Sequence, residues 1–165
     1  MAAVISELDP SREGSDRAVA QIVRLERRIF PKHESLARSF YEELRKKNGG
    51  LMYARLENGK GGGEEEEVIG YVMYSWVTSL CASITKLAVK DSHRKKGHGE
   101  ALLKAAMEKC RQRKIHRISL HVDPTRTPAV SLYKKLGFQV DGIIESYYSP
   151  ERNAYRMYLD FDYNC

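Results

Sequence analysis

The chain has 165 residues, of which 42% are hydrophobic and 30% are charged. This length and composition are typical of one globular domain with a buried core. No hydrophobic run reaches the roughly 18 residues that a membrane-spanning helix needs. Because Glu7 comes early and no long apolar stretch surrounds it, the sequence predicts no secretory signal. We therefore expect no membrane partner, and a location in the cytoplasm or in both cytoplasm and nucleus.

The net charge of +6 and the isoelectric point of about 9.2 favour an anionic partner without identifying it. The basic residues are scattered, and the aromatic residues do not interleave with them as in single-strand binders, so we expect no nucleic-acid partner. Cys81, Cys110 and Cys165 are far apart and odd in number. They form no zinc-binding pattern and favour a reducing compartment, and we expect no bound metal.

Hydrophobic periodicity and turn residues divide the chain into strands and helices. Pro31 ends the first helix, Asn48-Gly49-Gly50 stops the second, and Gly137 caps the last. Thr127 is predicted as the N-cap of that last helix, with Pro128 at its first position. We expect strands near residues 4–8, 51–56, 68–77, 84–89, 117–123, 138–148 and 154–161, and helices near residues 16–30, 34–47, 99–114 and 128–136.

Residues 58–67 are rich in glycine and glutamate and predict a flexible, charged hairpin loop. The remaining order combines antiparallel hairpins with one βαβ crossover, which joins the strand at 84–89 to the strand at 117–123. This combination predicts an α+β fold with a mixed sheet.

The stretch from Ile84 to Leu103 is the most informative part of the sequence. A buried strand is followed by a basic turn, Arg94-x-x-Gly97-x-Gly99, and by the start of a helix. The N–H groups at a helix start, the helix dipole and the flanking cations favour a polyanion such as a pyrophosphate. The pattern is neither a P-loop nor a three-glycine dinucleotide fingerprint. From these residues alone, a basic surface turn capped by glycine is an equal alternative.

Two motifs together make the chain resemble a known family. Arg94-x-x-Gly97-x-Gly99 opens the third helix, and Ala129-x-x-x-Tyr133-x-x-x-Gly137-Phe138 covers the last one. In this order and separation they resemble the GNAT acyltransferases, in particular the N-terminal acetyltransferases, over about Val4 to Phe161. The resemblance implies an α+β fold with a mixed, mostly antiparallel central sheet of about six or seven strands, flanked by about four helices. It also implies one domain over residues 1–165, with acetyl-CoA as cosubstrate and no metal.

The resemblance assigns cofactor-binding residues as well. The strand residues Leu87, Ala88 and Val89 would pair with the pantetheine amides as an added strand does. Arg126 replaces an asparagine that often precedes the last helix in this family, and a phosphate contact is the role left to it. The turn would hold the pyrophosphate, mainly by backbone N–H groups, with Arg94, Lys95, Lys96, Gly97, His98, Gly99 and Glu100.

Acyl transfer to an amine needs a base for the amine and an acid for the departing thiolate. His121 lies mid-strand, opposite the apolar face, where N-terminal acetyltransferases of this family carry a His or Glu base. An imidazole also titrates near neutral pH. Tyr133 occupies the tyrosine position of the family motif and is the predicted acid; a tyrosine packed inside its helix is the alternative. Some of these enzymes have a catalytic tyrosine where this chain has Ser83, so that base is absent.

Two local matches predict a protein N-terminus as the acceptor. Arg28-Ile29-Phe30-Pro31 and Glu145-Ser146-Tyr147-Tyr148 resemble the two loops that hold the peptide in those enzymes. Lys32 and His33 replace residues that help to select the first side chain, so a sequence preference does not transfer. Simple packing in a hairpin is the alternative for the two tyrosines. The predicted acceptor-binding residues are Phe30, Pro31, Lys32, Tyr147 and Tyr148.

Other functions stay open at this point. The acceptor of an enzyme could be an internal lysine, a small amine or a polyamine, and an auxiliary subunit could accompany it. A catalytically silent acetyl-CoA-binding protein is a different class, which the presence of both His121 and Tyr133 disfavours. A nucleic-acid-binding protein that uses the basic turn would show strongly salt-dependent binding.

Overall fold

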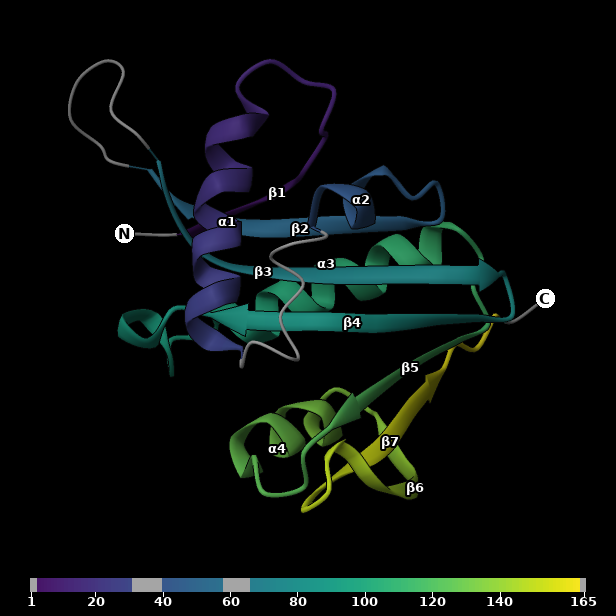
Figure 1. Cartoon of the computed structure of the whole chain (residues 1–165). Helices are drawn as coiled ribbons and strands as arrows, with labels where there is room; N and C mark the ends of the chain where they lie inside the picture. The colour runs from purple at the N-terminus through teal and green to yellow at the C-terminus, as the bar shows by residue number, and fades with distance from the viewer. Residues whose placement is uncertain (1–2, 31–39, 58–65, 164–165) are drawn as a thin grey trace. The chain divides into compact units, whose positions relative to one another are not determined.

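The computed structural model describes residues 3–30, 40–57 and 66–163. Within them, strands and helices follow one another in the order that the sequence predicts (Figure 1). The strands are β1 Ala3–Glu7, β2 Gly49–Leu56, β3 Glu67–Thr78, β4 Cys81–Val89, β5 Arg117–Val122, β6 Gln139–Ser149 and β7 Arg152–Asp160. The helices are α1 Ser15–Ile29, α2 Phe40–Arg45, α3 His98–Gln112 and α4 Thr127–Lys135, with a short 3-10 helix, η1, at Asp91–His93.

The strands form a 7-stranded sheet in the order β1-β2-β3-β4-β5-β7-β6. β1 pairs with β2 in antiparallel register, and β7 pairs in the same way with both β5 and β6. β4 and β5 are parallel, and α3 connects them along the chain, so the predicted βαβ crossover is confirmed. The predicted α+β class with a mixed, mostly antiparallel sheet is confirmed as well.

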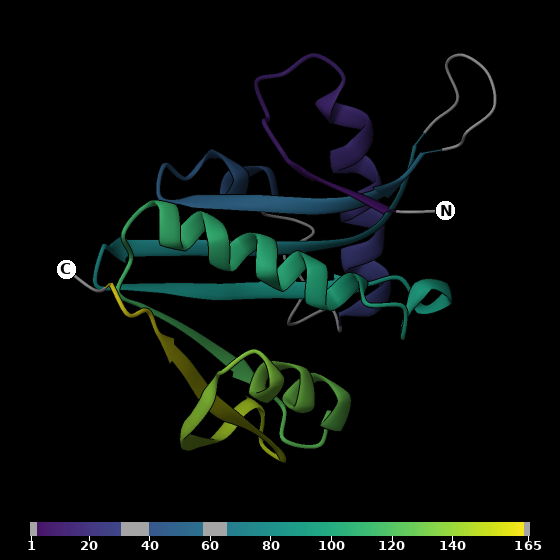
Figure 2. The same cartoon turned by 180° about the vertical axis from the view of Figure 1, so that it is seen from behind.

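Residues 1–74 and 86–106 form one compact unit, here called the N-terminal unit. The apolar face of α1 carries Ile22 and Leu25, which share a buried core with Leu51, Tyr71 and Ala88 from the strands. α1 lies on one face of these strands, and the first turns of α3 lie on the other (Figures 1 and 2). The spacing of the apolar residues in α1 therefore determines which side of this helix packs against the strands.

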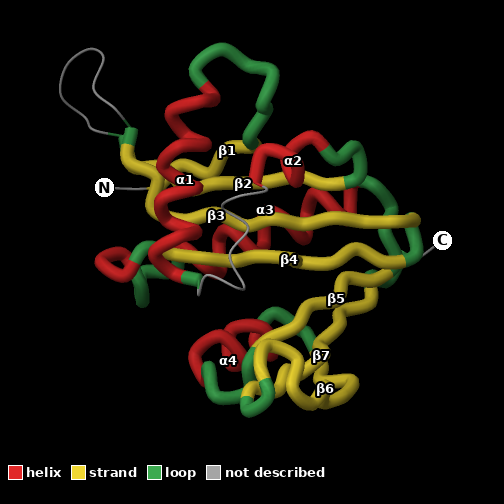
Figure 3. The backbone as a smooth tube through the Cα atoms, in the orientation of Figure 1, coloured by secondary structure: helices red, strands yellow, loops and turns green. Residues whose placement is uncertain are grey.

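Residues 75–85 and 107–165 form the second unit, here called the C-terminal unit. In it β5, β7 and β6 lie side by side, with α4 beside them (Figure 3). Ile118, Leu120 and Val122 are buried, whereas His121 is exposed. This alternation is the one that the sequence predicts for a half-buried strand, and it places His121 on the face opposite the core.

Two local predictions are wrong. Thr127 is the first residue of α4, and Arg126 occupies the N-cap without a capping side-chain bond. Gly49 and Gly50 do not end the second helix but begin β2. A side chain at Gly50 would overlap the hydroxyl of Tyr74, so the strand needs this glycine for packing.

Some predictions fall on residues that the structure does not describe. Residues 34–39 of the predicted second helix and residues 58–65 of the predicted loop lie outside the described ranges, and Glu67 begins β3. Among the helices of the described ranges, none is both long and apolar enough to cross a membrane.

Candidate active site

The predicted pyrophosphate turn lies in the N-terminal unit between β4 and α3. Its backbone is left-handed at two positions, Lys95 with a φ of 61° and Gly97 with a φ of 85°. Arg94 is held against the turn, because its Nε donates to the Val89 carbonyl at 3.1 Å and a terminal nitrogen lies 2.8 Å from the Asp91 carboxylate. Arg94 therefore braces the turn, and its contact with a phosphate stays a prediction.

α3 begins directly after this turn. The N–H of Ala101 donates to the Gly97 carbonyl at 3.0 Å, which closes the first helical turn. The N–H groups of His98, Gly99 and Glu100 precede that bond, so they are the donors that a helix start offers to an anion. The Glu100 carboxylate pairs with a lysine one turn later at 3.3 Å, which offsets its negative charge. The backbone here therefore fits a pyrophosphate.

Exposed lysines supply positive charge at the same place. Lys95 and Lys96 are both exposed. The ring of His98 adds little charge at neutral pH, because partial burial and the nearby His93 and Lys96 lower its pKa. The lysines and the helix dipole therefore provide the attraction for an anion.

The strand residues of the predicted pantetheine site lie at the end of β4. The parallel pairing of β4 with β5 ends at the pair Ile84↔Leu120. Leu87, Ala88 and Val89 lie beyond that pair, in a stretch that is still extended. An amide-containing ligand can add to such a strand through backbone hydrogen bonds.

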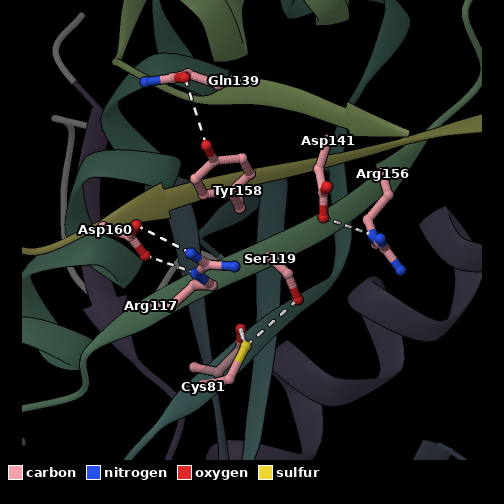
Figure 4. Close-up of polar contacts among 9 residues, drawn as sticks. Cys81, Arg117, Ser119, Gln139, Asp141, Arg156, Tyr158 and Asp160 are labelled. Atoms are coloured by element: carbon pink, nitrogen blue, oxygen red, sulfur yellow. Dashed lines mark hydrogen bonds and ion pairs between the residues drawn. The ribbon is translucent and has the colours of Figure 1, made fainter. Parts of the chain in front are cut away.

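His121 lies on β5 in the C-terminal unit, opposite Arg156 of β7. Its ring stacks on that of Tyr147 from β6, with centroids 4.5 Å apart and planes inclined by 16°. Partial burial and the charge of Arg156 lower the pKa of His121, so the neutral ring, which can accept a proton, predominates at neutral pH. Arg156 is itself paired with Asp141 at 2.9 Å (Figure 4). The fold thus joins a predicted base to a predicted acceptor-binding residue.

The two tyrosines of β6 form a braced pair. The ring of Tyr147 contacts that of Tyr148 edge to face at 4.8 Å, and the Arg152 guanidinium lies 4.9 Å from the Tyr148 centroid. The Nε of Arg152 also pairs with the Asp123 carboxylate at 3.3 Å. Burial raises the pKa of Asp123, but the bonds from Thr125 and Arg152 outweigh it and lower the pKa overall. Asp123 therefore remains charged and holds Arg152 against the Tyr148 ring.

Sequence reasoning missed this role of Asp123. The signal was the turn Asp123-Pro124-Thr125, since an aspartate before such a turn often accepts the N–H two residues later. That bond is present, with the Thr125 N–H 2.9 Å from the carboxylate.

Tyr133 lies in the last turn of α4, also in the C-terminal unit. It is 7% exposed, and burial raises the pKa of its phenol to about 12, against the opposing charge of Arg126. The Phe138 ring contacts it edge to face at 5.9 Å. The helix ends in the predicted glycine cap: Gly137 has a φ of 103°, and the Phe138 N–H donates to the Tyr133 carbonyl at 3.0 Å. Tyr133 is therefore protonated at neutral pH and firmly held.

Ser83 occupies the β4 position where some N-terminal acetyltransferases carry a tyrosine. Its hydroxyl lies 3.5 Å from that of Ser119 on β5. Ser119 also accepts a bond from the Cys81 thiol at 3.7 Å (Figure 4). A serine hydroxyl does not titrate near neutral pH, so this cluster adds no base.

Phe30 lies in the N-terminal unit at the C-cap of α1. The ammonium of Lys86, from β4, lies 3.7 Å from the centroid of its ring. Lys86 also pairs with Glu26 of α1, with 3.6 Å between Nζ and Oε1. Sequence reasoning missed both residues, although Glu26 lies four residues after Ile22 on the apolar face of α1.

The predicted site residues fall into two groups. The N-terminal unit contains the turn, the strand residues of β4 and Phe30. The C-terminal unit contains His121, Tyr133 and the exposed Arg126, together with both tyrosines of β6. Pro31 and Lys32, predicted to bind the acceptor, lie outside the described residues.

Comparison with known proteins decides the family. The model of the Acetyltransferase (GNAT) family matches residues 19–138, more than half of the chain. The chain is a member of the GNAT acetyltransferase family. An N-alpha-acetyltransferase of Sulfolobus acidocaldarius is 32% identical to it over 152 residues, covering 84% of each protein. A Bacillus subtilis protein classed as a ribosomal protein bS18-alanine N-acetyltransferase is 35% identical over 111 residues, 67% of this chain and 68% of its own length.

The fold agrees with this assignment. The crystal structure of Arabidopsis thaliana NAA60 in complex with acetyl-CoA has a TM-score of 0.81 at 19% identity, covering 96% of this chain and 98% of that one. The predicted family and fold are therefore confirmed. This GNAT protein is an acetyl-CoA-dependent N-acetyltransferase, and acetyl-CoA is its cosubstrate.

Proposed function

We propose that this GNAT acetyltransferase transfers the acetyl group to the α-amino group of protein N-termini. The observation that carries the proposal is the stacking of His121 on Tyr147, at 4.5 Å. The two rings are in direct contact, and this contact supports a site in which His121 is the base and Tyr147 lines the peptide. A peptide that lies along Tyr147 would bring its terminal amine to the imidazole. The N-alpha-acetyltransferase from Sulfolobus acidocaldarius, 32% identical, supports the same acceptor class.

In this proposal His121 is the general base. An N-terminal amine is largely protonated near neutral pH, and it attacks a thioester only in its neutral form. The lowered pKa of His121 keeps its ring neutral and able to take that proton. The amine nitrogen then bonds to the thioester carbonyl carbon, and the carbon–sulfur bond breaks. Backbone N–H groups near Val89 would stabilise the negative oxygen of the intermediate.

Tyr133 assists the departing sulfur. Its pKa of about 12 keeps the phenol protonated, so it can donate a hydrogen bond to the thiolate as the carbon–sulfur bond breaks. An ordinary thiol has a pKa of about 8.5, so full proton transfer from such a phenol is unfavourable. The main contribution of Tyr133 is therefore stabilisation of the thiolate. The nitrogen loses its second proton as the amide forms, and this proton converts the thiolate to the thiol of coenzyme A, while His121 passes the first proton to solvent.

The residues assigned to acetyl-CoA each have a separate role in this proposal. Leu87, Ala88 and Val89 pair with the pantetheine arm, and the turn from Arg94 to Glu100 binds the pyrophosphate. Arg126 contributes a further phosphate contact. The family match from residue 19 to residue 138 includes parts of both units, which supports one catalytic domain.

The test is an acetylation assay with three acceptors in parallel. These are a peptide with a free N-terminus and no lysine, a peptide with a blocked N-terminus and one lysine, and a polyamine. We expect transfer to the first peptide, with mass spectrometry locating the acetyl group on the α-amine. Acetylation of the blocked peptide or the polyamine alone would refute the proposal.

A further inference from the structure

A buried ion pair fixes a lysine at the acceptor end of α1. Glu26 is 0% exposed, accepts a hydrogen bond from the Tyr71 hydroxyl and pairs with Lys86 at 3.6 Å. A carboxylate in such a place stays charged only when it is both paired and hydrogen-bonded. The ammonium of Lys86 is thereby held in place, and it lies 3.7 Å from the centroid of the Phe30 ring.

Among the residues that the structure describes at this end of α1, the charges exposed to solvent are positive. The side chain of Lys86 is 13% exposed, whereas that of Glu26 is 0% exposed. The last turn of α1 adds the exposed side chains of Arg27 and Arg28. The exposed charges near Phe30 are therefore those of cations, whereas the Glu26 carboxylate that pairs with Lys86 is inaccessible to a bound molecule.

Lys86 lies next to residues that we assign to the cofactor and to the acceptor. It immediately precedes Leu87, the first of the β4 residues that we assign to the pantetheine arm. Its ammonium touches Phe30, which we assign to the acceptor. A cation between these two elements attracts an acidic side chain next to the reacting amine and repels a basic one.

We infer that Lys86, held by Glu26, is a specificity-determining residue that favours acceptors with acidic side chains beside the reacting amine. The inference rests on the proposed N-terminal acetylation and names its preferred substrate class. The preference arises from both attraction and repulsion, because discrimination is a difference between two free energies.

The test compares kcat/KM for three peptides with free N-termini. They share one sequence and differ only at the second and third residues, which are both Glu, both Ala or both Lys. For the unchanged enzyme we expect the acidic peptide to exceed the basic one on the order of tenfold, with the neutral peptide between them. The ratio should fall as salt is raised from about 0.05 M to about 0.5 M, because salt screens the exposed charges of the peptide, Arg27 and Arg28.

Three variants separate the charge of Lys86 from its packing. Lys86→Met alone would remove the cation that pairs with the buried Glu26 carboxylate, so the decisive variant is Glu26→Gln/Lys86→Met. It removes both charges, keeps an acceptor for the Tyr71 hydroxyl, and lets a flexible apolar side chain contact Phe30. Lys86→Arg keeps the cation. Lys46→Met is the matched control, since Lys46 is an exposed lysine paired with Glu43.

The expected result is a severalfold lower ratio for the double variant, which stays above one because Arg27 and Arg28 remain. Lys86→Arg and Lys46→Met should leave the ratio unchanged. Thermal melting followed by circular dichroism establishes that each variant is folded. A folded double variant that keeps the tenfold ratio overturns the inference, and so does an unchanged enzyme that treats the three peptides alike. In both cases N-terminal acetylation itself still stands. If none of the peptides is acetylated at its α-amine, the proposed function fails and the inference falls with it.

Discussion

Tyr71→Phe removes a single hydroxyl that donates to a fully buried carboxylate. Both Tyr71 and Glu26 are 0% exposed, so water does not replace the lost hydrogen bond. A hydrogen bond to a charged group contributes about 1.5–3 kcal/mol. We therefore expect the free energy of unfolding to fall by about 2 kcal/mol, which lowers Tm by about 4–8 °C in a protein of this size.

Urea unfolding followed by circular dichroism measures this change. The matched control is Tyr53→Phe, because Tyr53 is a half-buried tyrosine of β2 that packs against the same core. We expect that control to stay within about 0.5 kcal/mol of the unchanged protein. In a double-mutant cycle with Glu26→Gln, the coupling energy should exceed about 0.5 kcal/mol.

Equal effects of Tyr71→Phe and Tyr53→Phe, both below about 0.5 kcal/mol, would refute the reasoning. The Glu26 carboxylate would then not depend on the tyrosine hydroxyl, and the argument that a bonded carboxylate holds Lys86 in place would lose its basis.

Three further predictions concern catalysis and cofactor binding. Arg156→Gln removes a charge that lowers the pKa of His121; this pKa then rises, and the acidic limb of the kcat/KM–pH profile moves to higher pH. An unmoved limb would show that His121 is not the base. Tyr133→Phe should lower kcat by about 100-fold, with the KM for acetyl-CoA unchanged in steady-state assays; equal turnover would remove Tyr133 from the mechanism. Gly97→Ala forces a side chain onto a φ of 85°, so the KM for acetyl-CoA should rise several-fold. Gly142→Ala is the control: an added Cβ meets no atom within 4 Å at either glycine, but the backbone of Gly142 is not left-handed, so this KM should stay unchanged.

Predictions made from glycine residues were correct where the requirement for glycine was local and wrong where it came from a distant residue. Gly137 was correctly expected as a helix cap, because a left-handed backbone is a local demand of the last helical turn. Gly50 was wrongly expected to stop a helix, because its requirement comes from the Tyr74 hydroxyl on β3. Thr127 was predicted as the N-cap because threonine is a common capping residue, but α4 begins at Thr127 and its N-cap is Arg126.

The sequence by itself determined the order of strands and helices, the α+β class and the position of the basic turn before α3. Each depends on interactions between near neighbours, such as the alternation along β5 or the donors at the start of α3. Only the tertiary structure decided that β7 lies between β5 and β6, which sets Arg156 opposite His121. There the charge of Arg156 adds to the effect of burial in lowering the pKa of His121. The tertiary structure also decided that Glu26 is buried with Lys86 and Tyr71, residues distant in the sequence. A charge on a helix is usually solvated, and only its partners from other strands make it an internal ion pair.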